Sequence, residues 1–146
     1  PMKVSPALIE AALNTPEKAL RMVNVFSRNT LAPPSGPGFW VYGAGLALGR
    51  RVLRSNPQVN VFHRGFVACD SYANGEQAMA RTTCPVLFAL GAADQMTPPK
   101  AAQGLIATAR STGQRVQVVS LPSGHNQMSE APDETLMALR DFLATA

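Results

Sequence analysis

Two short apolar runs constrain the fold of this chain more than any other feature of its sequence. The first, Pro-Val-Leu-Phe-Ala-Leu, covers residues 85–90 and is closed by Gly91. It is typical of a strand that is buried on both faces, as in a parallel sheet. The second, Val-Gln-Val-Val-Ser-Leu, covers residues 116–121 and is stopped by Pro122. Because two strands alone make a poor sheet, the runs predict a sheet with further strands beside them.

Helical patterns separate and follow the two predicted strands. Thr97-Pro98-Pro99 predicts the start of a helix. Its inner side is expected to hold Ala101, Ala102, Leu105, Ile106 and Ala109. A final helix is expected from about Pro132, and its buried residues are expected to be Leu136, Leu139 or Leu143, and Phe142. The fold class is therefore α/β, with a βαβα unit of parallel strands over residues 75–146.

The first part of the chain, residues 1–74, is predicted to be helical. The expected helices cover residues 6–14, a segment from residue 16 with Ala19, Met22, Val23 and Phe26 on one face, residues 39–55 and residues 59–73. Asn74-Gly75 is a typical C-cap pair for the last of these. Leu31–Gly38 contains three prolines and two glycines, so it is predicted to be a loop.

Composition excludes several classes of protein. The chain has 146 residues, of which 46% are apolar and 15% charged, so a packed core is expected. Its thirteen Lys and Arg residues are mostly scattered, which argues against a nucleic-acid partner. No run approaches the roughly 18 apolar residues of a membrane span, and no membrane partner is expected. Pro1-Met2 is not a natural initiation, so an internal start is expected.

Cysteine usage suggests where the protein works. Cys69 and Cys84 each lie in an apolar stretch, which favours two reduced, buried thiols in a cytoplasmic protein. No spacing of zinc ligands is present, and we expect neither a metal nor a cofactor.

The residues with catalytic chemistry follow the two predicted strands. Asp94 comes shortly after the first strand, and His125 shortly after the second. Loops at the carboxyl edge of a parallel sheet commonly form ligand sites. If the strands are neighbours, the carboxylate can fix the tautomer of the imidazole and stabilise the imidazolium. The other ring nitrogen can then act as a general base.

Both loops resemble segments of the α/β-hydrolase superfamily. Gly91-x-x-Asp94-x-x-x-Pro98 is similar to the family's acid loop, and Pro122-x-Gly124-His125 is similar to its histidine loop. The segment Glu130-Ala131-Pro132 also matches the Glu-x-Pro that commonly follows that histidine. The resemblance implies that Asp94 is the triad acid and His125 the triad base. It also implies that residues 1–74 are a cap, or lid, and that residues 75–146 are the C-terminal βαβα part of the core.

The sequence departs from the family in one major respect. The family carries its nucleophile on a Gly-x-Ser-x-Gly elbow, and the sequence contains no such pentapeptide. Neither Ser71 nor Ser123 offers a substitute. The chain therefore supplies two triad positions of three, and we expect it to be inactive alone.

Three further residues are candidates for substrate binding. Trp40 could line a substrate cavity from the cap or belong to the core of the cap. Met96 and Met128 are candidates because they lie close in sequence to Asp94 and His125. His63 is expected to have a structural or surface role.

Two other classes of function compete with a hydrolase. Gly43-Ala44-Gly45-Leu46-Ala47-Leu48-Gly49 resembles a dinucleotide fingerprint, although a helix with small residues for close packing explains it better. The chain could instead be a non-catalytic structural or association unit.

If the chain belongs to a hydrolase, the intact protein is expected to be a cytoplasmic serine esterase for small apolar acyl substrates. An aspartate nucleophile, C–C bond hydrolysis and perhydrolysis remain alternatives. The expected partners are the N-terminal half of the same hydrolase or another copy of the chain.

Overall fold

The computed structural model describes residues 2–29 and 40–145, which form two compact units. The first unit comprises Pro1–Phe26 and Gly38–Ala73, and the second comprises Ser27–Pro37 and Asn74–Ala146. The predicted loop Leu31–Gly38, and residue 39 of the predicted helix 39–55, lie outside the described residues.

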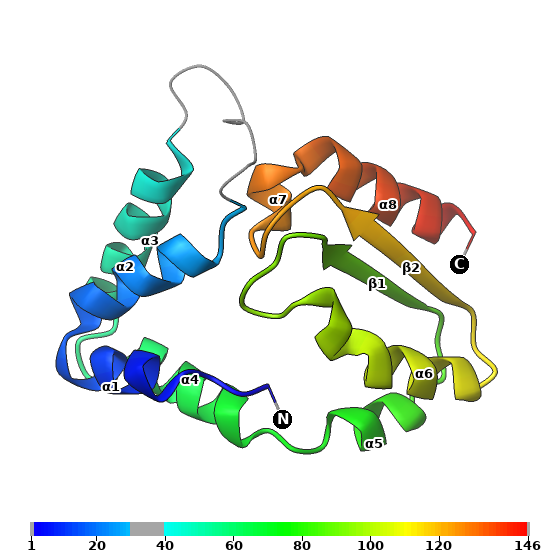
Figure 1. The fold of residues 1–146 in the computed structure, drawn as a ribbon, viewed down its shortest axis with the longest axis horizontal. Helices are drawn as coiled ribbons and strands as arrows, with labels where there is room; N and C mark the ends of the chain where they lie inside the picture. The colour runs from blue at the N-terminus through cyan, green and yellow to red at the C-terminus, as the bar shows by residue number, and fades with distance from the viewer. Residues whose placement is uncertain (1, 30–39, 146) are drawn as a thin grey trace. The chain divides into compact units, whose positions relative to one another are not determined.

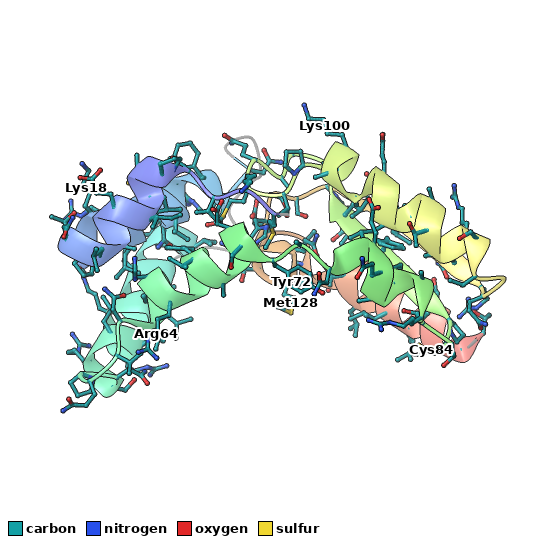
Figure 2. The ribbon with its side chains drawn as sticks, turned by 90° about the horizontal axis from the view of Figure 1, so that it is seen from below. Lys18, Arg64, Tyr72, Cys84, Lys100 and Met128 are labelled. Carbon is teal, nitrogen blue, oxygen red and sulfur yellow. The ribbon has the colours of Figure 1, made fainter. Side chains whose placement is uncertain are left out.

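The first unit is helical, as the sequence predicts (Figure 1). Its helices are α1 (Pro6–Asn14), α2 (Pro16–Phe26), α3 (Val41–Ser55) and α4 (Val61–Ser71). Small side chains let α1 and α2 approach closely, and the core of the unit is formed by Leu8, Ala11, Ala12 and Ala19. Polar side chains such as Lys18 and Arg64 point into solvent (Figure 2).

Glycines on α3 allow the helix to pack closely against α2. A Cβ atom on Gly49 would lie 2.6 Å from Leu20 Cδ2, and one on Gly45 would lie 2.0 Å from Asn24 Oδ1. These contacts confirm the interpretation of residues 43–49 as a close-packing helix. Gly43, Gly45 and Gly49 lie within α3, whereas the glycines of a dinucleotide fingerprint form the turn that opens a helix.

The predicted end of α4 is wrong. The helix ends at Ser71, with Tyr72 as its C-cap, and Asn74-Gly75 instead begins a short helix, α5 (Gly75–Ala80). Asn is favoured both before a helix and just after one, so the sequence alone does not distinguish the two positions. Phe26 also departs from the predicted buried face, since it is exposed at the end of α2.

The second unit contains both predicted strands and the helices between and after them. Its elements after α5 are β1 (Val86–Gly91), the 3₁₀ helix η1 (Pro99–Ala102), α6 (Gln103–Ser111), β2 (Val116–Leu121), α7 (Gln127–Glu130) and α8 (Pro132–Ala144). The strands pair in parallel, from Val86 opposite Val116 to Gly91 opposite Leu121. In Figure 1, α8 runs along one side of the strands and α6 along the other.

The predicted burial of the strands and of α8 is only partly correct. Within the described residues the sheet has two strands, and Val118 of β2 remains 40% exposed. The residues that α8 buries are Thr135 and Ala138. The leucines expected to be buried there are exposed: Leu136, Leu139 and Leu143. The two-stranded sheet gives α8 only a narrow surface to cover, and small side chains are enough to fill it.

Two smaller findings bear on the sequence-based expectations. Cys69 and Cys84 are free thiols, but the prediction that both are buried is wrong: Cys69 is half-buried. Cys84, which precedes β1, is exposed (Figure 2). In the part of the chain that the structure describes, no helix has the length and apolar character needed to cross a membrane.

Candidate active site

The candidate site lies where β1 and β2 end. Because the register places Gly91 opposite Leu121, the loops that follow the two strands start side by side. We call residues 92–98 the acid loop and residues 122–126 the histidine loop. Backbone hydrogen bonds join them, from the Ala92 N–H to the Leu121 carbonyl (2.9 Å) and from the Ala93 N–H to the Ser123 carbonyl (2.9 Å).

Two glycines permit this close approach. A Cβ atom on Gly91 would lie 2.2 Å from the carbonyl oxygen of Gly124, a backbone atom that has no flexible side chain to move aside. A Cβ atom on Gly124 would lie 2.5 Å from the backbone nitrogen of Asn29. The site therefore requires glycine at both positions because other parts of the backbone occupy the space of a side chain.

Asp94 is held by hydrogen bonds at both carboxylate oxygens. Oδ1 accepts from the backbone N–H groups of Met96 (2.8 Å) and Thr97 (2.9 Å). Oδ2 accepts from the Thr97 hydroxyl (2.8 Å) and lies 2.9 Å from Nδ1 of His125. The side chain is only 4% exposed, so these contacts replace water around the carboxylate.

These contacts also determine the charge of Asp94. Burial by itself would raise the pKa of this carboxyl group. Hydrogen bonds from Thr97, His125 and the Met96 amide outweigh the burial and lower the pKa below its ordinary value of 3.8. The group is therefore an anion at neutral pH, as an acid that orients a histidine must be.

His125 combines a fixed backbone with an accessible ring. Its amide donates to the carbonyl of Ser27 (2.9 Å), and its side chain is 40% exposed. When Nδ1 donates its proton to Asp94, Nε2 carries the lone pair and can accept a proton from a reacting group. The pair thus has the geometry of a general base with its orienting carboxylate.

Thr97 is a member of this site that the sequence did not reveal. Its hydroxyl contacts Oδ2 of Asp94 and lies 3.2 Å from Nδ1 of His125. Because Thr97 lies on the Nδ1 side of the ring, it is not placed to exchange a proton with Nε2. The sequence pattern indicated only that Thr97 precedes a helix, and its position three residues after Asp94 was the only other signal.

Two of the predicted substrate-binding residues lie in the second unit. Met96 lies in the acid loop, partly buried, and contributes its amide to Asp94. Met128 is 80% exposed on α7 (Figure 2). Trp40 belongs to the first unit, where it is 67% exposed and its ring centroid lies 5.8 Å from that of Tyr42. Substrate binding by these three residues stays a prediction.

His63 and two serines have contacts that differ from those of a triad. His63 borders a hollow of about 610 Å³ between α1 and α4, and all the residues lining the hollow belong to the first unit. Ser123 is fully buried and its hydroxyl donates to the Gly124 carbonyl (3.2 Å). Ser71 donates to the Val67 carbonyl within α4 (2.8 Å). In the described part of the chain, no group of three or more His, Cys, Asp or Glu residues could hold a metal ion.

Solved structures of esterases are similar to nearly the whole of this chain. A thermophilic esterase matches 99% of this chain and 52% of its own chain, with 21% identity and a TM-score of 0.68. An esterase from Exiguobacterium antarcticum matches 94% of this chain and 46% of its own, with 16% identity and a TM-score of 0.66. The fold is that of the α/β-hydrolases.

A third structure with this fold is that of an N-acyl homoserine lactone degrading enzyme. It matches 95% of this chain and 52% of its own, with 17% identity and a TM-score of 0.64. The chain thus spans about half the length of the α/β-hydrolases that it resembles. No protein-family model and no curated protein sequence matches it.

Proposed function

We propose that this chain supplies the acid and the base of a catalytic triad in a serine esterase of the α/β-hydrolase fold. The observation that carries the proposal is the 2.9 Å contact between Asp94 Oδ2 and His125 Nδ1 at the carboxyl edge of paired parallel strands. The proposal is also supported by the similarity of the chain to solved structures of esterases.

The mechanism assigns one role to each residue. A serine contributed by sequence outside this chain attacks the carbonyl carbon of the ester. Nε2 of His125 takes the proton from the serine hydroxyl and later delivers it to the leaving alcohol. Asp94 keeps the proton of His125 on Nδ1 and stabilises the imidazolium that forms during the attack. A water molecule, deprotonated by His125 in the same way, then attacks the acyl-enzyme and releases the carboxylic acid and the serine.

Small, fairly apolar acyl compounds are the proposed substrates. Trp40, Met96 and Met128 are apolar, and we propose that they contact the acyl side of the substrate. A lactone is a cyclic ester and is opened by the same attack. The similarity to the lactone-degrading enzyme therefore supports lactones as a second substrate class.

The nucleophile and the rest of the sheet must come from elsewhere. We propose that they belong to the N-terminal half of the same hydrolase, which residues 1–74 cover as a cap, or to a second chain that pairs with this one. The exposed β2 residue Val118 and the exposed leucines of α8 support such a partner, because added strands would cover them. The free thiols of Cys69 and Cys84 favour the cytoplasm as the place of action.

Hydrolysis of p-nitrophenyl acetate and butyrate tests the proposal. The 146-residue chain is assayed beside a longer polypeptide that also contains the N-terminal half required by the proposal, with its Gly-x-Ser-x-Gly. We expect the chain alone to match the buffer rate and the longer polypeptide to turn over. In the latter, Asp94→Asn is expected to lower kcat by about four orders of magnitude, the size of effect seen when a triad acid loses its charge.

His125→Ala is expected to lower kcat at least as far, while His63→Ala serves as the matched control and leaves the rate unchanged. Rapid turnover by the 146-residue chain alone would contradict the proposal. So would undiminished turnover by the Asp94 and His125 variants.

A further inference from the structure

Glu130 makes a set of hydrogen bonds that lies outside the Asp94–His125 pair. It is the last residue of the short helix α7, five residues after His125. Its Oε2 accepts from the backbone N–H groups of Asn29 (2.7 Å) and Gly124 (3.1 Å). Its Oε1 accepts from the backbone N–H of Asn126 (3.3 Å).

These contacts lie on both sides of His125 in the sequence. Gly124 and Asn126 are its immediate neighbours, and both donate to the same carboxylate. His125 itself donates its amide to the carbonyl of Ser27, in the segment that Glu130 holds through Asn29. The backbone that carries the imidazole is thus bound before, at and after His125.

The hydrogen bonds of the Glu130 carboxylate indicate an anchoring role. Within residues 2–29 and 40–145 its donors are backbone amides, which do not give up protons at ordinary pH, so these contacts offer no path for a proton from Glu130 to His125. A hydrogen bond from an amide to a charged carboxylate is stronger than one to a neutral acceptor, which suits a fixed anchor. The backbone of Glu130 is also fixed, because its amide donates to the Asn126 carbonyl (2.9 Å).

We propose that Glu130 is the positioning residue of the histidine loop, fixing the backbone on both sides of His125 so that the imidazole meets Asp94 and the reacting serine in one orientation. The proposal rests on the triad function argued above. Catalytic groups must be held within a fraction of an ångström of the productive geometry, and second-layer hydrogen bonds commonly provide this restraint.

Amide hydrogen exchange measured by NMR on the 146-residue chain tests the anchoring without reference to activity. In Glu130→Ala we expect the Gly124 amide to exchange about ten to a hundred times faster, the factor that corresponds to losing a hydrogen bond to a charged acceptor. Asn126 should change less, because its amide also contacts the Ser27 carbonyl (3.2 Å). The Ala92 amide, which donates to Leu121, serves as the internal reference.

Two variants separate the carboxylate from general effects of charge and helix stability. Glu130→Gln keeps one side-chain oxygen that can accept from the Gly124 amide. The Gly124 amide should therefore exchange within about threefold of its original rate, a small change that reflects the weaker bond to a neutral acceptor. Glu134→Ala removes an exposed carboxylate of α8 and should leave every loop amide unchanged. A Gly124 exchange rate in Glu130→Ala within twofold of the original would overturn the anchoring.

Ester kinetics of the longer, active polypeptide test the positioning. Glu130→Ala is expected to lower kcat about ten- to a hundredfold with KM unchanged. Glu130→Gln should retain most of kcat, and Glu134→Ala should have no effect on kcat or KM. The concentration of active sites, titrated by the burst of p-nitrophenol, should stay constant across the series. If it falls in parallel with kcat, the role is merely structural and the proposal is wrong.

The rates of ester hydrolysis of these variants distinguish the positioning role of Glu130 from the proposed function. If Asp94→Asn and His125→Ala abolish hydrolysis while Glu130→Ala retains full kcat, the triad stands and the positioning role is refuted. If Asp94→Asn and His125→Ala leave hydrolysis intact, the proposed function fails and the positioning role fails with it. The exchange measurement then shows whether Glu130 still anchors the loop.

Discussion

Asp94 shows how a buried carboxylate keeps its charge. Its side chain is almost completely removed from water, yet hydrogen bonds from Thr97, His125 and Met96 hold its pKa below the ordinary value of 3.8. In the pH range between the folded and the ordinary pKa, the unfolded chain binds the proton that the folded chain does not. The stability from this group is therefore fully present above about pH 4 and is lost as the pH falls through the folded pKa.

Asp94→Asn tests this dependence. The variant lacks the titrating group, so its deficit in free energy of unfolding should be constant above pH 4 and should shrink as the pH falls below the ordinary pKa of 3.8. Urea denaturation of both proteins between pH 2 and pH 7 measures it. A deficit that is independent of pH over this range would contradict the assigned pKa shift.

Thr97 is the second residue whose chemistry can be tested by itself. Thr97→Val keeps the shape of the side chain and the backbone N–H that binds Oδ1 of Asp94, but removes the hydroxyl that binds Oδ2. We expect kcat/KM of the active polypeptide to fall roughly tenfold, in proportion to the loss of one hydrogen bond to a charged group. Thr97→Ser, which keeps the hydroxyl, should retain at least half of the activity.

Some residues of the candidate site can be predicted from the sequence, and others cannot, for a physical reason. Asp94 and His125 were predictable because each follows an apolar strand, and parallel strands end at a common edge. The role of Thr97 depends on a side-chain rotamer. The contacts of His125 with Ser27 and of Glu130 with Asn29 join segments about a hundred residues apart in the chain, and no local pattern contains that information.

The junction of the acid and histidine loops is the element on which the site depends. Gly91→Ala would place a Cβ atom 2.2 Å from the Gly124 carbonyl oxygen, and the backbone must shift to relieve the overlap. We expect a loss of about 2–3 kcal/mol in the free energy of unfolding, at the upper end of overpacking effects.

Gly104→Ala is the matched control for this change within the same unit. Its Cβ would meet only the carboxylate end of the Glu76 side chain, which can rotate away. Because Ala is favoured over Gly inside a helix, stability should stay constant or rise by up to about 1 kcal/mol. Equal losses for the two variants, measured by urea denaturation, would show that the loops do not approach each other as described.

Elements with strong periodic or apolar patterns were predictable, and short ones were not. The strands β1 and β2 were predicted within one residue, and α1 to α4 within a few residues. Helices α5 and α7 were missed because six and four residues are too few to show a helical period. Missing α7 matters most, since it carries Glu130.

For the chain as a whole, the exposed apolar residues support the proposal that further structure covers α8. Leu136 of α8 is 64% exposed, and Leu143 is 69% exposed. The sequence pattern predicted that these leucines are buried, and the structure of this chain leaves them open. The chain spans about half the length of the α/β-hydrolases that it resembles, and under the proposed function the pattern reflects the surroundings that α8 has in a complete sheet.

Leu136→Glu tests this interpretation when it is made both in the 146-residue chain and in the longer polypeptide. In the 146-residue chain the free energy of unfolding should change by no more than about 0.5 kcal/mol, as expected for an exposed site. In the longer, active polypeptide it should fall by about 2 kcal/mol or more, because a buried leucine is then lost. Ala138→Glu, at a position that is 7% exposed, should destabilise both. Equal small effects of Leu136→Glu in the two settings would mean that nothing covers α8.

Labelling with a serine-reactive fluorophosphonate, followed by peptide mass spectrometry, tests directly whether His125 activates a serine outside this chain. It is applied to the ester-hydrolysing polypeptide and to its His125→Ala variant. We expect the label on the serine of a Gly-x-Ser-x-Gly sequence outside residues 1–146, at a rate that falls more than about a hundredfold in His125→Ala. A label on one of the serines of this chain, or labelling that proceeds equally well without His125, would contradict this expectation.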